Sequence, residues 1–250
     1  MKRLSILFLA LAALTATSSA QEKENYMMFE NTRLVVKTDK YKEFGDAVSK
    51  HNKKYHAEGP FHANVWLVSV GANAGQFVWS MGPATYTDLD SRPNGKDHTE
   101  DWTQNVMPNV KHVVETNFWK NDKKLSYNPD PENRVSSKLS IRVFDLNDWQ
   151  GYRFKELMQK VVKVYNEKKY DWTLNTYWSE FDVNTDEDVA VVWGFEKWAW
   201  FDKDPQFKKD FEEVNGEGSW ENFMEELRGT IRGTKDEVWE LIPEMSGTVE

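Results

Sequence analysis

Cysteine is absent from the 250 residues of this chain. This absence excludes disulfides, thiolate catalysis, sulfur-ligated metal sites and a bacterial lipoprotein anchor. Positive charge is also scarce, since 32 basic residues face 41 acidic ones and the net charge is −9. Nucleic-acid binding requires a basic surface, and an anionic membrane surface would repel such a chain. We therefore expect neither nucleic acid nor membrane among its partners.

Long apolar runs are missing after the first residues. The sequence MKRLSILFLALAALTATSSA has two positive charges, an apolar run of about a dozen residues, and small residues at Ser18 and Ala20. This run is shorter than the roughly 18 apolar residues of a membrane helix. The pattern predicts an export signal peptide over residues 1–20 and a periplasmic or secreted protein. Without Lys2 and Arg3, 30 basic residues face 41 acidic ones, a net charge of −11.

Aromatic residues are abundant, in contrast. Only 39% of the residues are hydrophobic, but 14% are aromatic, including 12 tryptophans. Each aromatic side chain can bury about 150–250 Å². We therefore expect a core that is built largely from rings.

The tryptophans mark an internal repeat. Two segments, from about residue 26 to 127 and from about 137 to 245, carry one pattern in the same order. The spacing between corresponding tryptophans grows from 112 to 120 residues, as loop insertions would produce. The pairs are Trp66 with Trp178, Trp79 with Trp193, Trp102 with Trp220, and Trp119 with Trp239. The predicted domains are a first repeat at 21–127, a linker at 128–136 that contains NPDPEN, and a second repeat at 137–250.

Each repeat has the order strand, helix, strand, strand, helix, strand. In the second repeat, SKLSIRVF alternates in hydrophobicity as a strand does, and apolar residues from Phe154 to Tyr165 form one helical stripe. The second helix of the first repeat is predicted to extend from Trp102 to Val114, with Pro108 starting or kinking it. The extra stretch DPQFKKDFEEVNGEG is interpreted as a longer loop with one helical turn rather than an added helix.

The βαββαβ order is that of a ferredoxin-like unit, which is too small to bury both faces of its own sheet. The sequence therefore predicts an α+β fold in which two ferredoxin-like repeats pack their antiparallel sheets as an intramolecular α/β barrel. Fusion of the two units predicts a monomer. This pattern resembles the dimeric α/β-barrel superfamily in a tandem, single-chain form. The resemblance covers nearly all of residues 26–245 and rests on element order and internal symmetry.

The superfamily includes haem-degrading monooxygenases, which use an Asn on the first strand, a Trp at the start of the second helix and a His ten residues later. The first repeat weakly resembles them in Asn31, Trp102 and His112. This resemblance implies that His112 would bind haem iron, that Asn31 would donate a hydrogen bond to an iron-bound ligand, and that Trp102 would press on the macrocycle. The second repeat has Ile141 and Thr230 at the corresponding positions.

Asn31 is also notable without the resemblance. The even spacing of 110 residues between Asn31 and Ile141 conserves the face of a strand, so Asn31 is predicted where the sister repeat has an apolar residue. A polar group there needs a partner or a ligand.

All five histidines fall in the first repeat. His51 and His56 are five residues apart, which places them about 140° apart around a helix and does not favour a shared ion. We interpret both as solvated surface residues. His62 is interpreted as a hydrogen-bonded structural residue.

These observations predict an exported protein that holds a small, flat, largely apolar or aromatic ligand between sheet and helices. Its enzymatic form would be a haem-binding or haem-degrading monooxygenase-like protein with its site at Asn31, Trp102 and His112. One alternative is a non-catalytic binding protein for an aromatic compound or a glycan, in which Trp198 and Trp200 on one strand face would stack on sugar rings. Another is a stress or association protein.

Overall fold

The structure is a computed structural model that describes residues 26–128, 136–183, 186–203 and 206–248. The predicted signal peptide and most of the predicted linker lie outside the described residues. Within the described ranges, no helix has the length and apolar character needed to cross a membrane.

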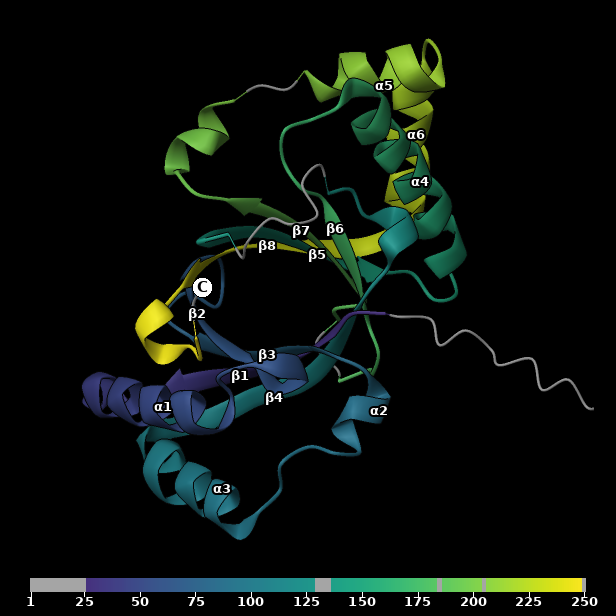
Figure 1. The fold of residues 1–250 in the computed structure, drawn as a ribbon. Coiled ribbons are helices and arrows are strands. Elements are labelled where there is room, and N and C mark those ends of the chain that lie inside the picture. The colour runs from purple at the N-terminus through teal and green to yellow at the C-terminus, as the bar shows by residue number, and fades with distance from the viewer. Residues whose placement is uncertain (1–25, 129–135, 184–185, 204–205, 249–250) are drawn as a thin grey trace, which may run out of the picture.

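Eight antiparallel strands close into one barrel, which Figure 1 shows nearly end-on. The order around the barrel is β1-β3-β2-β8-β5-β7-β6-β4, and β4 pairs again with β1. The strands are β1 (Met28–Val36), β2 (Ala63–Val70), β3 (Phe77–Ala84), β4 (Val110–Asn121), β5 (Lys138–Leu146), β6 (Asn175–Ser179), β7 (Val189–Phe195) and β8 (Ile231–Leu241).

The two repeats have the same strand order. The first contributes β4-β1-β3-β2 and the second contributes β8-β5-β7-β6. They join through β2 with β8 and through β4 with β6. The predicted fold, two ferredoxin-like repeats forming an intramolecular barrel, is therefore confirmed.

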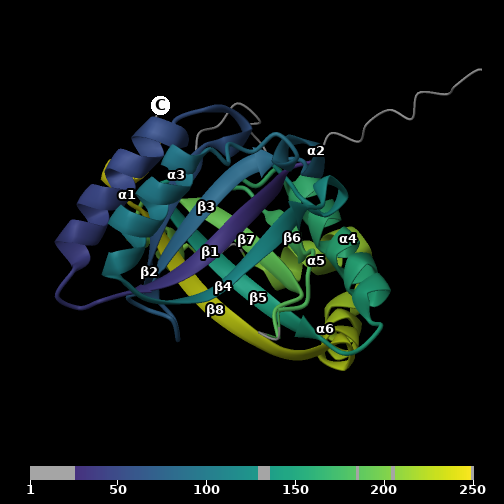
Figure 2. The same cartoon turned by 90° about the horizontal axis from the view of Figure 1, so that it is seen from below.

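Helices cover the outside of the barrel at two opposite places (Figures 1 and 2). On the first repeat these are α1 (Tyr41–Tyr55) and α3 (Lys96–Asp101), with the short α2 (Tyr86–Leu89) nearby. On the second repeat they are α4 (Gly151–Lys168), α5 (Phe207–Asn215) and α6 (Ser219–Thr230).

The period of two along each strand separates an inner from an outer apolar cluster. Outside the first sheet, Phe44 and Val48 of α1 pack on Leu34 and Trp79. Outside the second sheet, α4 contributes Phe154, which is fully buried. A third cluster lies inside the barrel and joins the repeats. It consists of Trp66, Val68, Val78, Ile141, Val143, Ala190, Val192 and Trp239.

Three of the four tryptophan pairs occupy matching faces. Trp79 and Trp193 lie on the outer faces, as do Trp102 and Trp220, and Trp119 and Trp239 contact the inner cluster. The pair Trp66 and Trp178 does not match. Trp66 is in the inner cluster, whereas Trp178 packs outside against the α4 side. A matching place in the sequence therefore did not ensure the same orientation on the second strand of each repeat.

Three local predictions were wrong. The first repeat has no long second helix. A π-helical turn at Trp102–Val106 and a 3-10 turn at Met107–Asn109, with Pro108 in it, end the helical segment, and β4 begins at Val110.

The extra stretch of the second repeat is an added helix, α5, because Phe211 finds a fully buried position against α4 and α6. The segment Trp198–Asp202 is a 3-10 helix, so Trp198 and Trp200 share no strand face.

Candidate functional site

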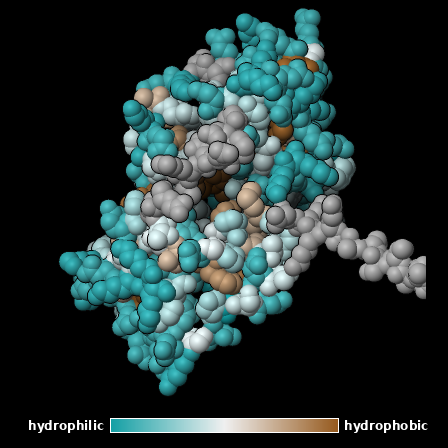
Figure 3. Space-filling model, in the orientation of Figure 1, coloured by the Kyte–Doolittle hydropathy of each residue, from teal (hydrophilic) through white to brown (hydrophobic). Residues whose placement is uncertain are grey.

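A cavity of about 300 Å³ lies inside the barrel. Figure 3 shows hydrophobic residues in a recess near the centre of the molecule, where the barrel of Figure 1 opens, between two largely hydrophilic lobes. Rings from both repeats line this cavity, among them Phe29, Trp66, Trp119, Tyr177 and Trp239. A mostly apolar wall with few polar groups is typical of small-molecule sites. The sequence predicted a pocket between sheet and helices, but this cavity lies between the two sheets.

Asn31 points into this cavity from β1. Its Oδ1 atom is buried and accepts no hydrogen bond from the described residues. Ile141 of the second repeat lines the same cavity, so the predicted correspondence of these positions holds. A buried carbonyl oxygen without a donor costs about 1–3 kcal/mol, and a ligand donor would recover this.

Arg33, two residues further along β1, anchors a charged network across the barrel. Its guanidinium lies 3.2 Å from Glu237 Oε2 on β8 and 3.3 Å from Glu115 Oε1 on β4. Arg33 and Glu237 are 6% and 5% exposed. Glu237 also accepts hydrogen bonds of 2.6 Å from Asn73 Nδ2 and from Trp239 Nε1. This satisfied network joins the repeats and makes one wall of the cavity polar.

Two further ionisable groups line the cavity. Burial raises the pKa of Glu187, and the nearby Glu115 raises it further, whereas Arg33 lowers it. Burial also raises the pKa of Tyr177 to about 12, so its phenol stays protonated at neutral pH. Among the described residues that line the cavity, Arg33 is the only one with a fixed positive charge.

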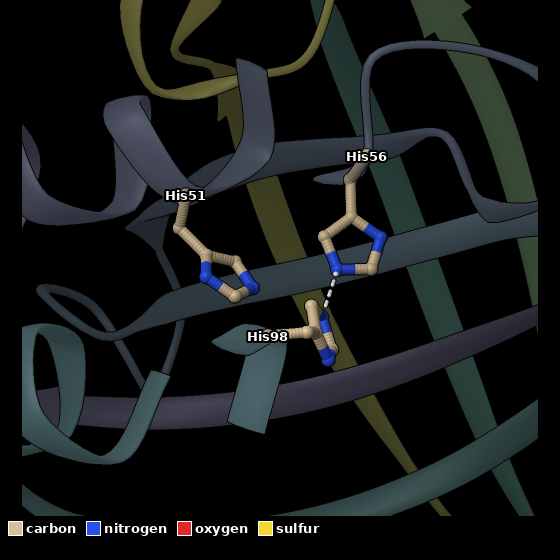
Figure 4. Close-up of side chains that lie close together, drawn as sticks. All are labelled: His51, His56 and His98. Carbon is tan, nitrogen blue, oxygen red and sulfur yellow. Dashed lines mark hydrogen bonds between the residues drawn. The ribbon is translucent and has the colours of Figure 1, made fainter. Parts of the chain in front are cut away.

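A second group of polar side chains lies on the other side of the first sheet. His51 belongs to α1, His56 follows the end of α1, and His98 belongs to α3 (Figure 4). The three rings form a nearly equilateral triangle with centroid distances of 5.2, 4.9 and 5.2 Å. His51 and His56 are each 1% exposed, and His98 is half-buried. The interpretation of His51 and His56 as solvated surface residues was wrong, because the aromatic wall formed by Trp79 and Trp102 covers them.

The outer nitrogens of two of these rings are held by partners. His51 Nδ1 lies 2.7 Å from Asp101 Oδ2, and His56 Nδ1 lies 2.7 Å from the carbonyl oxygen of Phe61. A carbonyl can only accept, so His56 carries its proton on Nδ1 and presents the lone pair of Nε2. That Nε2 atom lies 3.1 Å from His98 Nε2.

Burial keeps these imidazoles neutral. It lowers the pKa of His56 to about 4, and it also lowers the pKa values of His51 and His98. Burial acts to raise the pKa of Asp101, but hydrogen bonds with His51 and Asn105 outweigh it, so this pKa is lowered and Asp101 stays ionised. Three neutral imidazoles beside a carboxylate form a nitrogen donor set of the kind that late transition metals prefer.

The structure does not bring the three predicted site residues together. Asn31 lines the inner cavity, whereas Trp102 packs in the outer cluster on the opposite face of the sheet. His112 lies on β4 opposite Val35, and its side chain is exposed. His112 was predicted on a helix, but β4 begins at Val110, so His112 lies on a strand and its side chain points elsewhere.

Haem does not fit these residues. None of the described residues that line the inner cavity is a histidine, and its one tyrosine stays protonated at neutral pH. Haem iron requires an axial His, Cys, Met or Tyr ligand. His112 cannot supply it to the cavity because it is exposed and not part of the lining.

Sequence reasoning missed Arg33, Glu237 and the histidine cluster. The alternation Phe29, Asn31, Arg33 could have indicated a polar inner face on β1. The histidine cluster depends on α1 ending at Tyr55, because His56 then leaves the helical path and turns back toward His51. It also depends on His98, which is distant in the sequence.

No protein-family model matches this chain. No curated protein matches it either. Solved structures, in contrast, are similar over almost the whole chain. An anthrone oxidase-like protein is 10% identical with a TM-score of 0.55, covering 88% of this chain and 92% of its own. A candidate monooxygenase of Lactobacillus acidophilus NCFM is 8% identical with a TM-score of 0.53, covering 89% and 96%.

A third similar structure is a chlorite dismutase variant of Candidatus Nitrospira defluvii in complex with cyanide. It is 10% identical with a TM-score of 0.54, covering 88% of this chain and 93% of its own. This chain has the dimeric α/β-barrel fold, joined in one polypeptide. At such low identity the likeness concerns the fold and does not specify a function.

Proposed function

We propose that this α/β barrel is an exported binding protein for a small, flat, largely apolar molecule that occupies the cavity between its two sheets. The observation that carries the proposal is the buried, unpaired Oδ1 of Asn31 in an aromatic-walled cavity. A ring system would contact the indoles of Trp66, Trp119 and Trp239, and a hydroxyl or N–H group on it would donate to Asn31.

The size of the cavity limits the ligand. An apolar cavity of about 150 Å³ holds benzene. A cavity of about 300 Å³ therefore suits two or three fused rings with one polar group. The similar structures of a candidate monooxygenase and of an anthrone oxidase-like protein make oxidation of such a ring system the enzymatic form of this proposal.

The test compares two probes of the same shape. Naphthalene and 2-naphthol differ by one hydroxyl, and their binding is followed by quenching of tryptophan fluorescence. We expect 2-naphthol to bind about 5–10-fold more tightly, since one recovered hydrogen bond is worth about 1 kcal/mol or slightly more. In Asn31→Leu this preference should disappear while naphthalene still binds. Failure of both probes to bind, or an unchanged preference in Asn31→Leu, would contradict the proposal.

Haemin serves as the contrasting probe. Because His112 is exposed and outside the cavity lining, the absorbance spectrum of haemin should be the same with the wild-type protein and with His112→Ala. A Soret shift that depends on His112 would instead favour the haem-binding interpretation. The export half of the proposal is tested separately, by determining the N-terminal sequence and the cell fraction of the protein in a Gram-negative host.

A further inference from the structure

The three histidines outside the first sheet carry an inference that is independent of the barrel cavity. Trp79 lies on the outer face of β3 with its ring 5.0 Å from the ring of His56, whereas its neighbours Val78 and Ser80 line the inner cavity. The sheet therefore separates the two sites, and a ligand in one makes no contact with the other.

The nitrogen positions suit a metal ion. The ligand atoms of His51, His56 and His98 all lie within 4.8 Å of one another. Tetrahedral zinc with nitrogen ligands at about 2.0–2.1 Å has neighbouring nitrogens about 3.3 Å apart. The 3.1 Å distance between His56 Nε2 and His98 Nε2 is already close to that value. A shift of about 1.5 Å by the third ring would complete the set, and Figure 4 shows the three rings facing one another.

The supporting contacts are those of a metal site. Histidine ligands usually donate their second N–H to a carboxylate or a backbone carbonyl, which fixes the ring and its tautomer. Asp101 holds His51 in this way, and the Phe61 carbonyl holds His56. A hydrogen bond between His56 and His98 would explain why those two rings are close, but it would not explain why His51 lies equally close to both of them.

The donor set also selects the ion. Imidazole suits zinc, copper, iron and nickel, whereas calcium and magnesium prefer oxygen ligands. We propose that His51, His56 and His98 bind one divalent late transition-metal ion, with zinc as the reference, and that its remaining coordination position is open to water. His98 is half-buried, so ions can reach the site from the α3 side.

Such an ion would connect α1, the segment after it, and the six-residue α3. A helix this short has little stability of its own. Metal binding would therefore hold α3 against α1. An open coordination position on a three-histidine zinc ion is also an arrangement of catalytic zinc sites.

The experiment uses the full chain without a polyhistidine tag, stripped of metal with a chelator and dialysed. Zinc binding is measured by calorimetry, and cobalt is used as a spectroscopic probe because tetrahedral cobalt absorbs visible light strongly. We expect one equivalent of zinc, a tetrahedral cobalt spectrum, and a higher melting temperature with zinc.

The variants assign the ligands. His98→Ala, at the half-buried position, should lower zinc affinity at least 100-fold and abolish the cobalt spectrum. Asp101→Asn keeps all three ligands and should lower affinity about 10–100-fold. His112→Ala, an exposed histidine of the same repeat, is the matched control and should bind as the wild type does.

Circular dichroism verifies that each variant is folded. If His98→Ala fails to fold, Asp101→Asn and the cobalt spectrum of the wild type decide the question. Absence of one-equivalent binding by the wild type would overturn the proposal, as would undiminished binding by folded His98→Ala. The affinity for 2-naphthol inside the barrel should be the same with and without zinc, so that a negative result at one site leaves the proposal for the other site unaffected.

Discussion

Replacing Arg33 with Met tests whether the buried network joins the two repeats. Arg33 of the first repeat and Glu237 of the second are both almost fully buried. Their atoms lie 3.2 Å apart, and Arg33 also lies 3.3 Å from Glu115. Met keeps much of the volume of Arg33 but leaves the carboxylates without their cation. Removing one partner of a buried ion pair costs about 3–5 kcal/mol.

The assays are urea unfolding and thermal unfolding at pH 7, both followed by tryptophan fluorescence. A loss of this size should lower the melting temperature by roughly 10 °C in a domain of about 230 residues. Arg142→Met is the matched control, because Arg142 pairs with Asp236 across β5 and β8 at 2.7 Å but with side chains 49% and 61% exposed. The exposed pair should contribute only about 0–1 kcal/mol.

The double variant Arg33→Met with Glu237→Gln separates the pair from its surroundings. Gln keeps an acceptor for Trp239 and removes the charge that Arg33 balanced, so the double variant should be about 1–3 kcal/mol more stable than the sum of the single losses predicts. A cost for Arg33→Met as small as that of Arg142→Met, or strictly additive losses, would refute the reasoning.

The pH dependence of Arg33→Met follows from Glu187. Its folded pKa is raised by burial, and Arg33 is one of the charges that lowers it, so removing Arg33 should raise this pKa further. A carboxyl whose folded pKa exceeds its unfolded value loses stability as the pH rises through the folded pKa. The deficit of Arg33→Met should therefore be smaller at pH 5 than at pH 8.

Two further predictions concern the outer faces. Phe154→Ala should destabilise the protein by about 3–5 kcal/mol in urea, because this fully buried ring lies between α4 and the second sheet, whereas Tyr152→Ala, at a 60% exposed position on the same helix, should change stability by less than about 0.5 kcal/mol. The free energy of unfolding of the metal-free protein should fall by up to ~3 kcal/mol between pH 6.5 and pH 4, because the folded pKa of His56 lies at about 4 and the unfolded chain takes up the proton first. His56→Gln should lack this part of the acid sensitivity. A pH profile of stability identical to that of the wild type would contradict the assignment.

The fold was predictable because two signals agreed. The repeated tryptophans gave the symmetry, and the alternation in SKLSIRVF together with the stripe from Phe154 to Tyr165 gave the element types. The boundaries were less accessible. The valines between Val110 and Val114 fit the hydrophobic pattern of a helix as well as that of a strand. This segment is a strand because it pairs with β1.

The candidate sites were predictable only in part. Asn31 was predicted on the same strand face as Ile141, and both residues line the cavity, because strand periodicity is local information. The histidine cluster depends on a contact between residues that are 42 positions apart in the sequence, and the Arg33–Glu237 pair on one between residues that are 204 positions apart. Such contacts arise only when the chain closes, and no local pattern reports them.

Closure of the barrel within one polypeptide has a consequence for its evolution. In a barrel made from two identical chains every side chain occurs twice, so a change that benefits one half is imposed on the other. Here Asn31 and Ile141 line one shared interior, and histidines occur only in the first half of the sequence. Freed from symmetry, one half of the molecule can specialise in chemistry while the other supplies the rigid framework.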